Sequence, residues 1–261
     1  MKLKIYQVDA FADNLFSGNP AAVVPLNFWL SDDTMQLIAE ENNLSETAFF
    51  VRTKKTYHIR WFTPNGEVKL CGHATLASAY VIFNFIEKTL ENIEFSSLSG
   101  ILNVKRDNSF IVLDFPSQKF MKCQPKRDIS DGLGKDPSIL FKGEDYFAIF
   151  DRERDIEEIK PNFETLSNLD LRGVVISAKS QNYDFVSRAF YPKYGINEDP
   201  VTGSSHTMLI TYWSKILNKN HLKAKQVSKR GGVLNCINIG DRVQISGKSK
   251  LYMIGDIFLD I

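Results

Sequence analysis

The sequence predicts an α+β fold of two similar lobes related by a pseudo-twofold axis, each a mostly antiparallel sheet wrapped on a long central helix. Three observations predict it: a set of motifs that occurs twice in the same order, many strand-like segments separated by turn residues, and one long apolar helix pattern in each half. At 261 residues, of which 43% are hydrophobic, the chain is long enough for one large domain or two small ones with an ample core.

Three segments of the first half recur in the second half. The pairs are RWFTP at 60–64 with RAFYP at 188–192, CGHAT at 71–75 with TGSSH at 202–206, and SSLSGILN at 96–103 with SKRGGVLN at 228–235. Gly72 and Gly203 are 131 positions apart, and Gly100 and Gly232 are 132 apart, so the offset is nearly constant. Chance does not easily supply three such matches in one order, and we interpret them as a duplication.

Each half is expected to hold a similar set of elements. Strands are predicted at 3–11, 21–25, 47–52, 57–63, 93–97, 101–106 and 110–115, and again at 145–150, 173–178, 185–191, 224–229, 233–239, 242–247 and 251–259. Helices are predicted at 31–42, with Ser31 as the N-cap, and at 72–86, 161–168 and 203–217. Residues 118–136, rich in Pro, Lys and Asp, are the best candidate linker, which gives an N-terminal lobe at 1–117 and a C-terminal lobe at 118–261. The last strand could pack in either lobe.

Charge and composition exclude several classes of partner. Lys and Arg total 32 and Asp and Glu total 31, so the chain lacks the basic excess that nucleic-acid binding needs. The N-terminus alternates as a strand does, and the most apolar window, 74–86, is too short to cross a bilayer. Three widely spaced cysteines favour reduced thiols in the cytoplasm. A small-molecule partner is therefore expected, with no nucleic acid and no membrane.

A glycine opens the long helix of each half, at Gly72 and Gly203. The first N–H groups of a helix are unpaired and carry partial positive charge, so they attract anions, and glycine lets a ligand approach closely. Each glycine is followed by a hydrogen-bonding side chain, His73 or Ser204. If the lobes pack about a twofold axis, both helix starts face one cleft, and a carboxylate is the ligand that suits them.

Six ordered segments carry a family resemblance. They are VDAF at 8–11, FSGNPAAV at 16–23, LSETAF at 44–49, RWFTP at 60–64, CGHAT at 71–75 and EDPVTGSSH at 198–206. These segments resemble the PhzF-like isomerases of phenazine biosynthesis, a family that shares the two-domain fold of diaminopimelate epimerase. The resemblance is specific for the family but does not identify a substrate.

The resemblance implies roles for individual residues. Glu46 is the acid/base residue that moves a proton between carbons of the substrate, and its polar partners are His73, Asp199 and Ser204. The residues expected to contact the substrate are Asn19, Ser45, Gly72 and Gly203. The resemblance implies neither a metal nor an organic cofactor, and it makes a homodimer possible.

The chemistry expected of Glu46 depends on its surroundings. A proton shuttle must be basic when it abstracts and acidic when it returns the proton, and burial raises the pKa of a carboxyl group. Glu46 lies between Leu44 and the apolar residues 48–50, which fits such surroundings. Without the resemblance, the ordinary interpretation of Glu46 is a surface glutamate before a strand.

Two alternatives stay open beside the acid/base isomerase. Epimerases of this fold use two facing cysteines, but Cys71 is matched in the second half by Thr202, whose hydroxyl is too weak an acid. This disfavours a two-thiol racemase, and Cys71 is expected to be a small buried residue. Cys71 and His73 lack a second ligand pair with zinc-like spacing, so no metal is expected. The alternatives are an epimerase that uses Glu46 with Cys71 or Asp199, and a non-catalytic metabolite-binding or scaffold protein.

Overall fold

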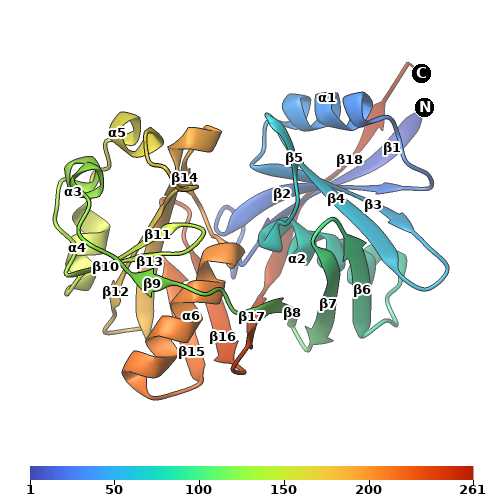
Figure 1. The fold of residues 1–261 in the computed structure, drawn as a ribbon. Coiled ribbons are helices and arrows are strands. Elements are labelled where there is room, and N and C mark those ends of the chain that lie inside the picture. Colours follow the sequence, from blue (N-terminus) through green and yellow to red (C-terminus); the bar gives the residue numbers. More distant parts are fainter. Residues whose placement is uncertain (261) are drawn as a thin grey trace. The chain divides into compact units, whose positions relative to one another are not determined.

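The computed structural model describes residues 1–260, and the chain separates into two compact units (Figure 1). Unit 1 comprises residues 1–114 and the segment from Ser246 onwards, and unit 2 comprises residues 115–245. Each unit combines mostly antiparallel strands with a few helices, which confirms the predicted α+β class. The last strand, whose place the sequence left open, belongs to unit 1.

Unit 1 is built from the first part of the chain and its C-terminal strand. Its strands are β1 (Lys2–Ala10), β2 (Asn19–Leu26), β3 (Glu46–Arg52), β4 (Tyr57–Thr63), β5 (Gly66–Val68), β6 (Asn92–Ser97), β7 (Gly100–Asp107), β8 (Phe110–Pro116, ending just past the boundary) and β18 (Ser249–Phe258). Its helices are α1 (Asp32–Asn42), α2 (Gly72–Val81) and the π-helix η1 (Ile82–Ile86).

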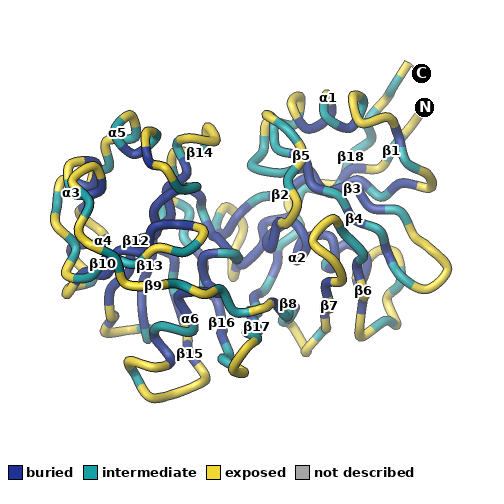
Figure 2. The backbone as a smooth tube through the Cα atoms, in the orientation of Figure 1, coloured by how far each residue is buried: buried dark blue, intermediate teal, exposed yellow. Residues whose placement is uncertain are grey.

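Helix α2 is the central helix of unit 1. All of its residues except Tyr80 are buried, and it packs against β1, β2, β3 and β18 (Figure 2). A helix that is apolar on all sides is stable only when other elements surround it. Its sequence, without a polar stripe, therefore requires the sheet that wraps around it.

Helix α1 covers the other side of the same strands (Figure 1). Met35 and Ile38 of α1 join a core with Val24 and Phe49 of the sheet. The hydroxyl of Ser31 accepts a hydrogen bond from the Thr34 N–H, so Ser31 is the N-cap as predicted. Because α1 and α2 cover both faces, β2 is an almost continuous apolar run.

The helix predicted at 72–86 is not one regular α-helix. The α-helix ends at Val81, and the Glu87 N–H then donates to the Ile82 carbonyl, five residues back. The Arg106 guanidinium lies 4.6 Å from the Phe83 ring and donates to the Phe83 carbonyl. These contacts with Arg106 stabilise the wider turn, which the apolar periodicity does not reveal.

Unit 2 has its own strands and helices. Its strands are β9 (Met121–Lys122), β10 (Ile139–Lys142), β11 (Tyr146–Ile149), β12 (Val174–Lys179), β13 (Phe185–Tyr191), β14 (Ile196–Asp199), β15 (His221–Gln226), β16 (Gly232–Asn238) and β17 (Arg242–Gly247, ending just past the boundary). Its helices are α3 (Arg127–Leu133), α4 (Glu153–Glu158), α5 (Phe163–Ser167), the 3-10 helix η2 (Pro192–Tyr194) and α6 (Gly203–Leu217).

The expected linker at 118–136 is wrong in part. It contains β9 and α3, and Ile129 and Leu133 of α3 are buried in the core that α3, α4 and α5 form with the sheet. Of the polar residues in this segment, Arg127, Asp128 and Asp131 are exposed on α3, and most of the others lie outside the helix. Only the two apolar positions face the core, which is too weak a pattern to predict a helix.

Strand pairing follows the same order in both units. In unit 1, β1–β2 is antiparallel, β2–β3 parallel, β3–β4 and β4–β5 antiparallel, β4–β6 parallel and β6–β7 antiparallel. In unit 2, the pairs β10–β11, β11–β12, β12–β13, β13–β14, β13–β15 and β15–β16 have the same directions in turn. Helices α2 and α6 occupy corresponding places in this order. The ancestral duplication itself stays an interpretation.

Across residues 1–260, no helix has both the length and the apolar composition that a membrane crossing requires.

Candidate active site

Three predicted site residues of unit 1 meet at the start of α2. Asn19 is the first residue of β2, Glu46 is the first residue of β3, and His73 follows Gly72 in the first turn of α2. The Nδ1 atom of His73 lies 3.2 Å from Asn19 Nδ2, and its Nε2 atom lies 3.2 Å from Glu46 Oε2. The imidazole therefore bridges the amide and the carboxylate. Ser45 is half-buried beside Glu46.

The His73 ring is 4% exposed, and burial lowers its pKa to about 3. The ring is therefore neutral at pH 7. Because the Asn19 amide donates to Nδ1, the proton of the neutral ring resides on Nε2, which faces Glu46. The distance between Nε2 and Oε2 is short enough for a hydrogen bond, but the two groups are not aligned for one. Such misalignment is common in active sites without a bound substrate.

The position of Asn19 depends on Gly18. Gly18 has φ +69°, and a Cβ atom there would lie 2.2 Å from the Ala10 carbonyl oxygen. The loop that leads into β2 is further tied by the Phe16 N–H, which donates to Asp9 at 3.0 Å. No other residue type fits position 18 without moving the loop, so this glycine fixes the amide that orients His73.

Cys71 lies beside the same ring. It is buried, as predicted, and its Sγ atom is 3.5 Å from His73 Nδ1. Donor atoms of Glu46, Cys71 and His73 all lie within 4.8 Å of one another. However, Glu46 and Cys71 contact opposite nitrogens of the imidazole, and a zinc ion needs its ligands around one ring nitrogen. In this arrangement the three residues do not form a zinc site.

The central helices of both units open in the same way. Gly72 and Gly203 are buried at the first positions of α2 and α6. Within residues 1–260, neither N-cap side chain, Cys71 nor Thr202, caps a backbone N–H of its own helix. Both helix starts thus keep backbone N–H groups that a side-chain cap would otherwise occupy, which suits them to bind an anion.

The loop between β14 and α6 holds Asp199. The Asp199 side chain is 8% exposed, and its carboxylate accepts a hydrogen bond of 2.5 Å from the Thr202 hydroxyl. Gln226 on β15 fixes the loop, because its Nε2 donates to the Asp199 carbonyl and its Oε1 accepts from the Thr202 N–H. Gln226 is one of the residues that the sequence did not single out, since a single glutamine in a strand carries no signal.

Ser204, in the first turn of α6, is joined to an ion pair that the sequence also did not reveal. Arg172 Nη2 lies 3.3 Å from Ser204 Oγ, and the guanidinium binds the buried Asp145 through two hydrogen bonds of 2.8 and 2.7 Å. Arg172 and Asp145 lie outside the repeated motifs, so the motif comparison could not find them.

His206 lies inside unit 2, in the first part of α6. Its side chain is fully buried, its Nδ1 donates to the Thr202 carbonyl at 2.7 Å, and burial lowers its pKa to about 4.

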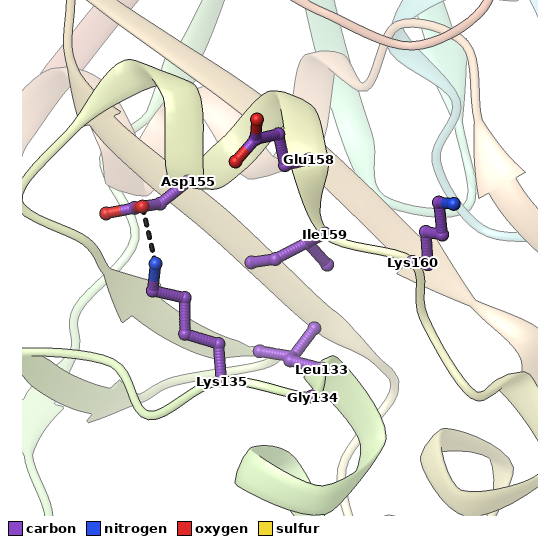
Figure 3. Close-up of a pocket in the computed structure, with 7 residues that line it drawn as sticks. All are labelled: Leu133, Gly134, Lys135, Asp155, Glu158, Ile159 and Lys160. Atoms are coloured by element: carbon purple, nitrogen blue, oxygen red, sulfur yellow. Dashed lines mark hydrogen bonds and ion pairs between the residues drawn. The ribbon is translucent and has the colours of Figure 1, made fainter.

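Two surface crevices lie away from these residues. The crevice of unit 2, about 250 Å³, is lined by Leu133, Gly134, Lys135, Asp155, Glu158, Ile159 and Lys160, and the Lys135–Asp155 ion pair lies within it (Figure 3). The crevice of unit 1, about 240 Å³, lies at the opposite end of α2 from His73, beside Tyr80 and Phe83. Neither contains a predicted site residue, so we place the candidate site by its chemistry.

Comparison with known proteins assigns the family. The family described as phenazine biosynthesis-like protein matches residues 8–255. The chain is 48% identical to an uncharacterised isomerase of Pseudomonas aeruginosa, and the match covers 99% of this chain and 100% of the relative. It is 44% identical to an uncharacterised isomerase of Halalkalibacterium halodurans, again over 99% of this chain and 100% of the relative.

Solved structures agree with the sequence relatives. A PhzF-family crystal structure from Enterococcus faecalis superposes with a TM-score of 0.96 at 46% identity, over 99% of this chain and 100% of that chain. A probable proline racemase of Agrobacterium radiobacter, at 8% identity, covers 99% and 93% with a TM-score of 0.69 and shares the fold alone. The chain belongs to the phenazine biosynthesis-like protein family, and it is an isomerase.

Proposed function

We propose that this isomerase moves a proton between carbons of a small carboxylate-bearing metabolite, without a cofactor, and that Glu46 is its general acid/base. The observation that carries the proposal is the set of contacts around His73, which bring a neutral imidazole and a carboxylate together in a buried place. The absence of a cofactor rests on the family resemblance.

The proposed reaction has two steps. The Glu46 carboxylate takes a proton from a substrate carbon, and the electron pair of the broken C–H bond is delocalised into the adjacent unsaturated system. The Glu46 carboxyl group then returns the proton to a different carbon, and the double bond shifts. A neutral His73 contributes an N–H donor without placing a positive charge beside the Glu46 carboxylate.

The second part of the proposal concerns unit 2. We infer that Asp199 and Ser204, with the N–H groups at the start of α6, bind the substrate. The open helix start and the anchored Asp199 loop support this role, because both present fixed polar groups. The N–H groups at Gly72 in α2 and at Gly203 in α6 are each suited to an anionic group of the metabolite.

An epimerase is the second candidate, because proteins described as epimerases share the fold. A two-thiol version is not favoured, since the counterpart of Cys71 is Thr202, whose hydroxyl donates to Asp199. The product's stereochemistry separates the candidates: a proton shift moves a double bond, whereas an epimerase inverts one carbon.

The experiment starts with a ligand search. A library of small carboxylic acids is screened by thermal shift, because a ligand that binds only the folded state raises the melting temperature. Each hit is then incubated with the wild-type protein in D2O, and isomerised product and deuterium uptake are followed by NMR and mass spectrometry.

Glu46→Gln tests the acid/base assignment. The amide cannot carry the proton, so we expect turnover to fall by at least about a hundredfold while ligand binding persists. Glu41→Gln is the matched control, since Glu41 is exposed at the end of α1, and it should retain full turnover. Near-normal turnover in Glu46→Gln would show that another group shuttles the proton.

A further inference from the structure

Arg172 is held in a fixed position by residues of unit 2 alone. Its Nε and Nη2 atoms donate to the two oxygens of Asp145, whose side chain is fully buried. The Tyr191 ring lies 5.3 Å from the guanidinium, and its hydroxyl donates to Asp145 at 3.2 Å. Burial, together with the Asp145 carboxylate, raises the Tyr191 pKa well above its ordinary value, so the phenol stays a donor. The guanidinium therefore cannot swing freely as a surface arginine does.

The residue next to Arg172 makes this packing possible. At Gly173 a Cβ atom would lie 2.4 Å from the Tyr191 ring and 2.3 Å from the Phe190 carbonyl oxygen. Glycine therefore allows the Tyr191 ring to close over Arg172.

Arg172 lies two residues before the place in unit 2 that corresponds to Glu46 in unit 1. The pair β2–β3 corresponds to β11–β12, both parallel, and α2 corresponds to α6. Glu46 begins β3, and Arg172 lies two residues before β12. Around them, Asn19 at the start of β2 corresponds to Asp145 just before β11. Near the start of the corresponding strand, one unit thus carries a carboxylate and the other a guanidinium.

The hydrogen bonds of Arg172 leave donors for a ligand. Of its five N–H groups, those of Nε and Nη2 serve Asp145 and Ser204, and among the described residues none accepts from Nη1. The Arg172 side chain is 34% exposed. Arginine has no acceptor, so Ser204 Oγ accepts from it and keeps its own O–H to donate.

A purely structural role for Arg172 would be to neutralise the buried Asp145. That role explains the two hydrogen bonds to Asp145, but it does not require the contact with Ser204 or an Nη1 group from which no described residue accepts. The exposed Glu144 also lies near Arg172, and its carboxylate accepts from Gln118 at 2.9 Å. Because Ser204 contacts Arg172 and lies in the first turn of α6, an anion bound to Arg172 Nη1 would also be near the Ser204 hydroxyl and the first N–H groups of α6.

We propose that Arg172 binds the carboxylate of the substrate, together with Ser204 and the start of α6. This inference rests on the proposed function, because it assigns the anion-binding role within that same site. In this scheme Arg172 is a fixed cation that holds the substrate and favours the electron-rich intermediate.

The test uses benzoate as the probe and benzamide as its uncharged counterpart of similar shape. Both are titrated into the full-length protein by NMR. The variants are Arg172→Lys, which keeps the charge but loses the planar fork, and the double change Asp145→Asn with Arg172→Gln, which leaves no buried carboxylate unpaired. Arg154→Gln is the control, because Arg154 forms an exposed pair with Glu158 in the same unit.

We expect the wild type and Arg154→Gln to bind benzoate at least about tenfold more tightly than benzamide, and the folded double variant to lose that preference. Arg172→Lys should fall between them. On a substrate found by the screen, Arg172→Lys should raise KM more than it lowers kcat. A wild type without preference for the carboxylate, or a folded double variant that retains it, would overturn the inference. The Glu46→Gln assay measures turnover, whereas the benzoate titration measures binding. Failure of the acid/base assignment would therefore change the first result and leave the second unchanged.

Discussion

At the scale of single residues, two buried histidines make stability depend on pH. Burial lowers the pKa of His73 to about 3 and that of His206 to about 4, from an ordinary value of 6.5. Below pH 6.5 the unfolded chain takes up protons at these positions and the folded protein does not. The contribution of each ring is therefore complete above about pH 6.5 and declines as the pH falls toward its folded-state pKa.

Urea unfolding between pH 7 and 4.5 measures this effect. We expect each histidine to lower the free energy of unfolding by about 1.4 kcal/mol per pH unit below pH 6. The lowered pKa values of Asp155 and Asp170, about 2 each, matter only at more acid pH. His73→Asn should have about half of the wild-type slope. A stability that is flat down to pH 4.5 would contradict the assignment of both rings as neutral.

At the scale of secondary-structure elements, each unit ties a strand to its neighbour with an arginine–glutamate pair. In unit 1, Arg60 on β4 binds both oxygens of Glu67 on β5, with both distances 2.7 Å. In unit 2, Arg188 on β13 binds both oxygens of Glu198 on β14, at 2.7 and 3.0 Å. The two arginines come from the matching RWFTP and RAFYP motifs.

The two pairs should differ in their contribution to stability. Arg188 is 9% exposed and also donates to the carbonyls of Ile156 and Ile159, which end α4, whereas Arg60 is paired with the exposed Asp32. Arg188→Gln should lower the free energy of unfolding by about 3 kcal/mol, because it leaves buried acceptors unpaired. Arg60→Gln should cost about 1 kcal/mol. Chemical denaturation of both variants makes the comparison, and equal losses would contradict it.

The sequence was most informative about long elements and least about short ones. Periodicity and glycine placement predicted α6 and the strand at 57–63 with their observed bounds. The strands β5, β9, β10 and β14 are two to four residues long, too short for an alternating pattern to stand out. The strand predicted at 224–229 lies three residues earlier, at His221–Gln226, because the turn that follows ends at Gly231 with φ +65°.

The same contrast applies to the candidate site. Glu46, His73 and Ser204 lie in motifs that repeat or match the family, so the sequence indicated them. Asp145 and Arg172 are 27 residues apart in the chain, and they come into contact because β11 and β12, which follow them, pair in parallel. Such long-range pairs leave no local pattern, and a structure is needed to find them.

At the scale of the whole molecule, the C-terminal strand is a structural part of unit 1. β18 pairs with β1 along its length, from Lys2 opposite Phe258 to Ala10 opposite Ser249. α2 packs against it as well. Removing β18 would expose one edge of β1 and the apolar side chains beneath it, including Ile5 and Val8, which are 7% and 0% exposed.

A variant that ends at Lys248 tests this role. We expect hydrogen exchange to become rapid in β1 and α2, because both lose a packing partner, while β12 and β13 keep their slow exchange. A variant that ends at Leu259 is the control and should behave as the wild type. Unchanged protection of β1 without β18 would show that the strand contributes little to the core.

This connection between the two ends of the chain has a consequence for biosynthesis. Because the ribosome makes β18 (Ser249–Phe258) after residues 1–248, β1 has no partner on that side until translation has passed Phe258. Residues 115–245 lie between the two strands, so they emerge, and can begin to fold, while the N-terminal half is still incomplete. The nascent protein should therefore acquire its protease resistance in an inverted order, with the middle of the polypeptide protected before its beginning.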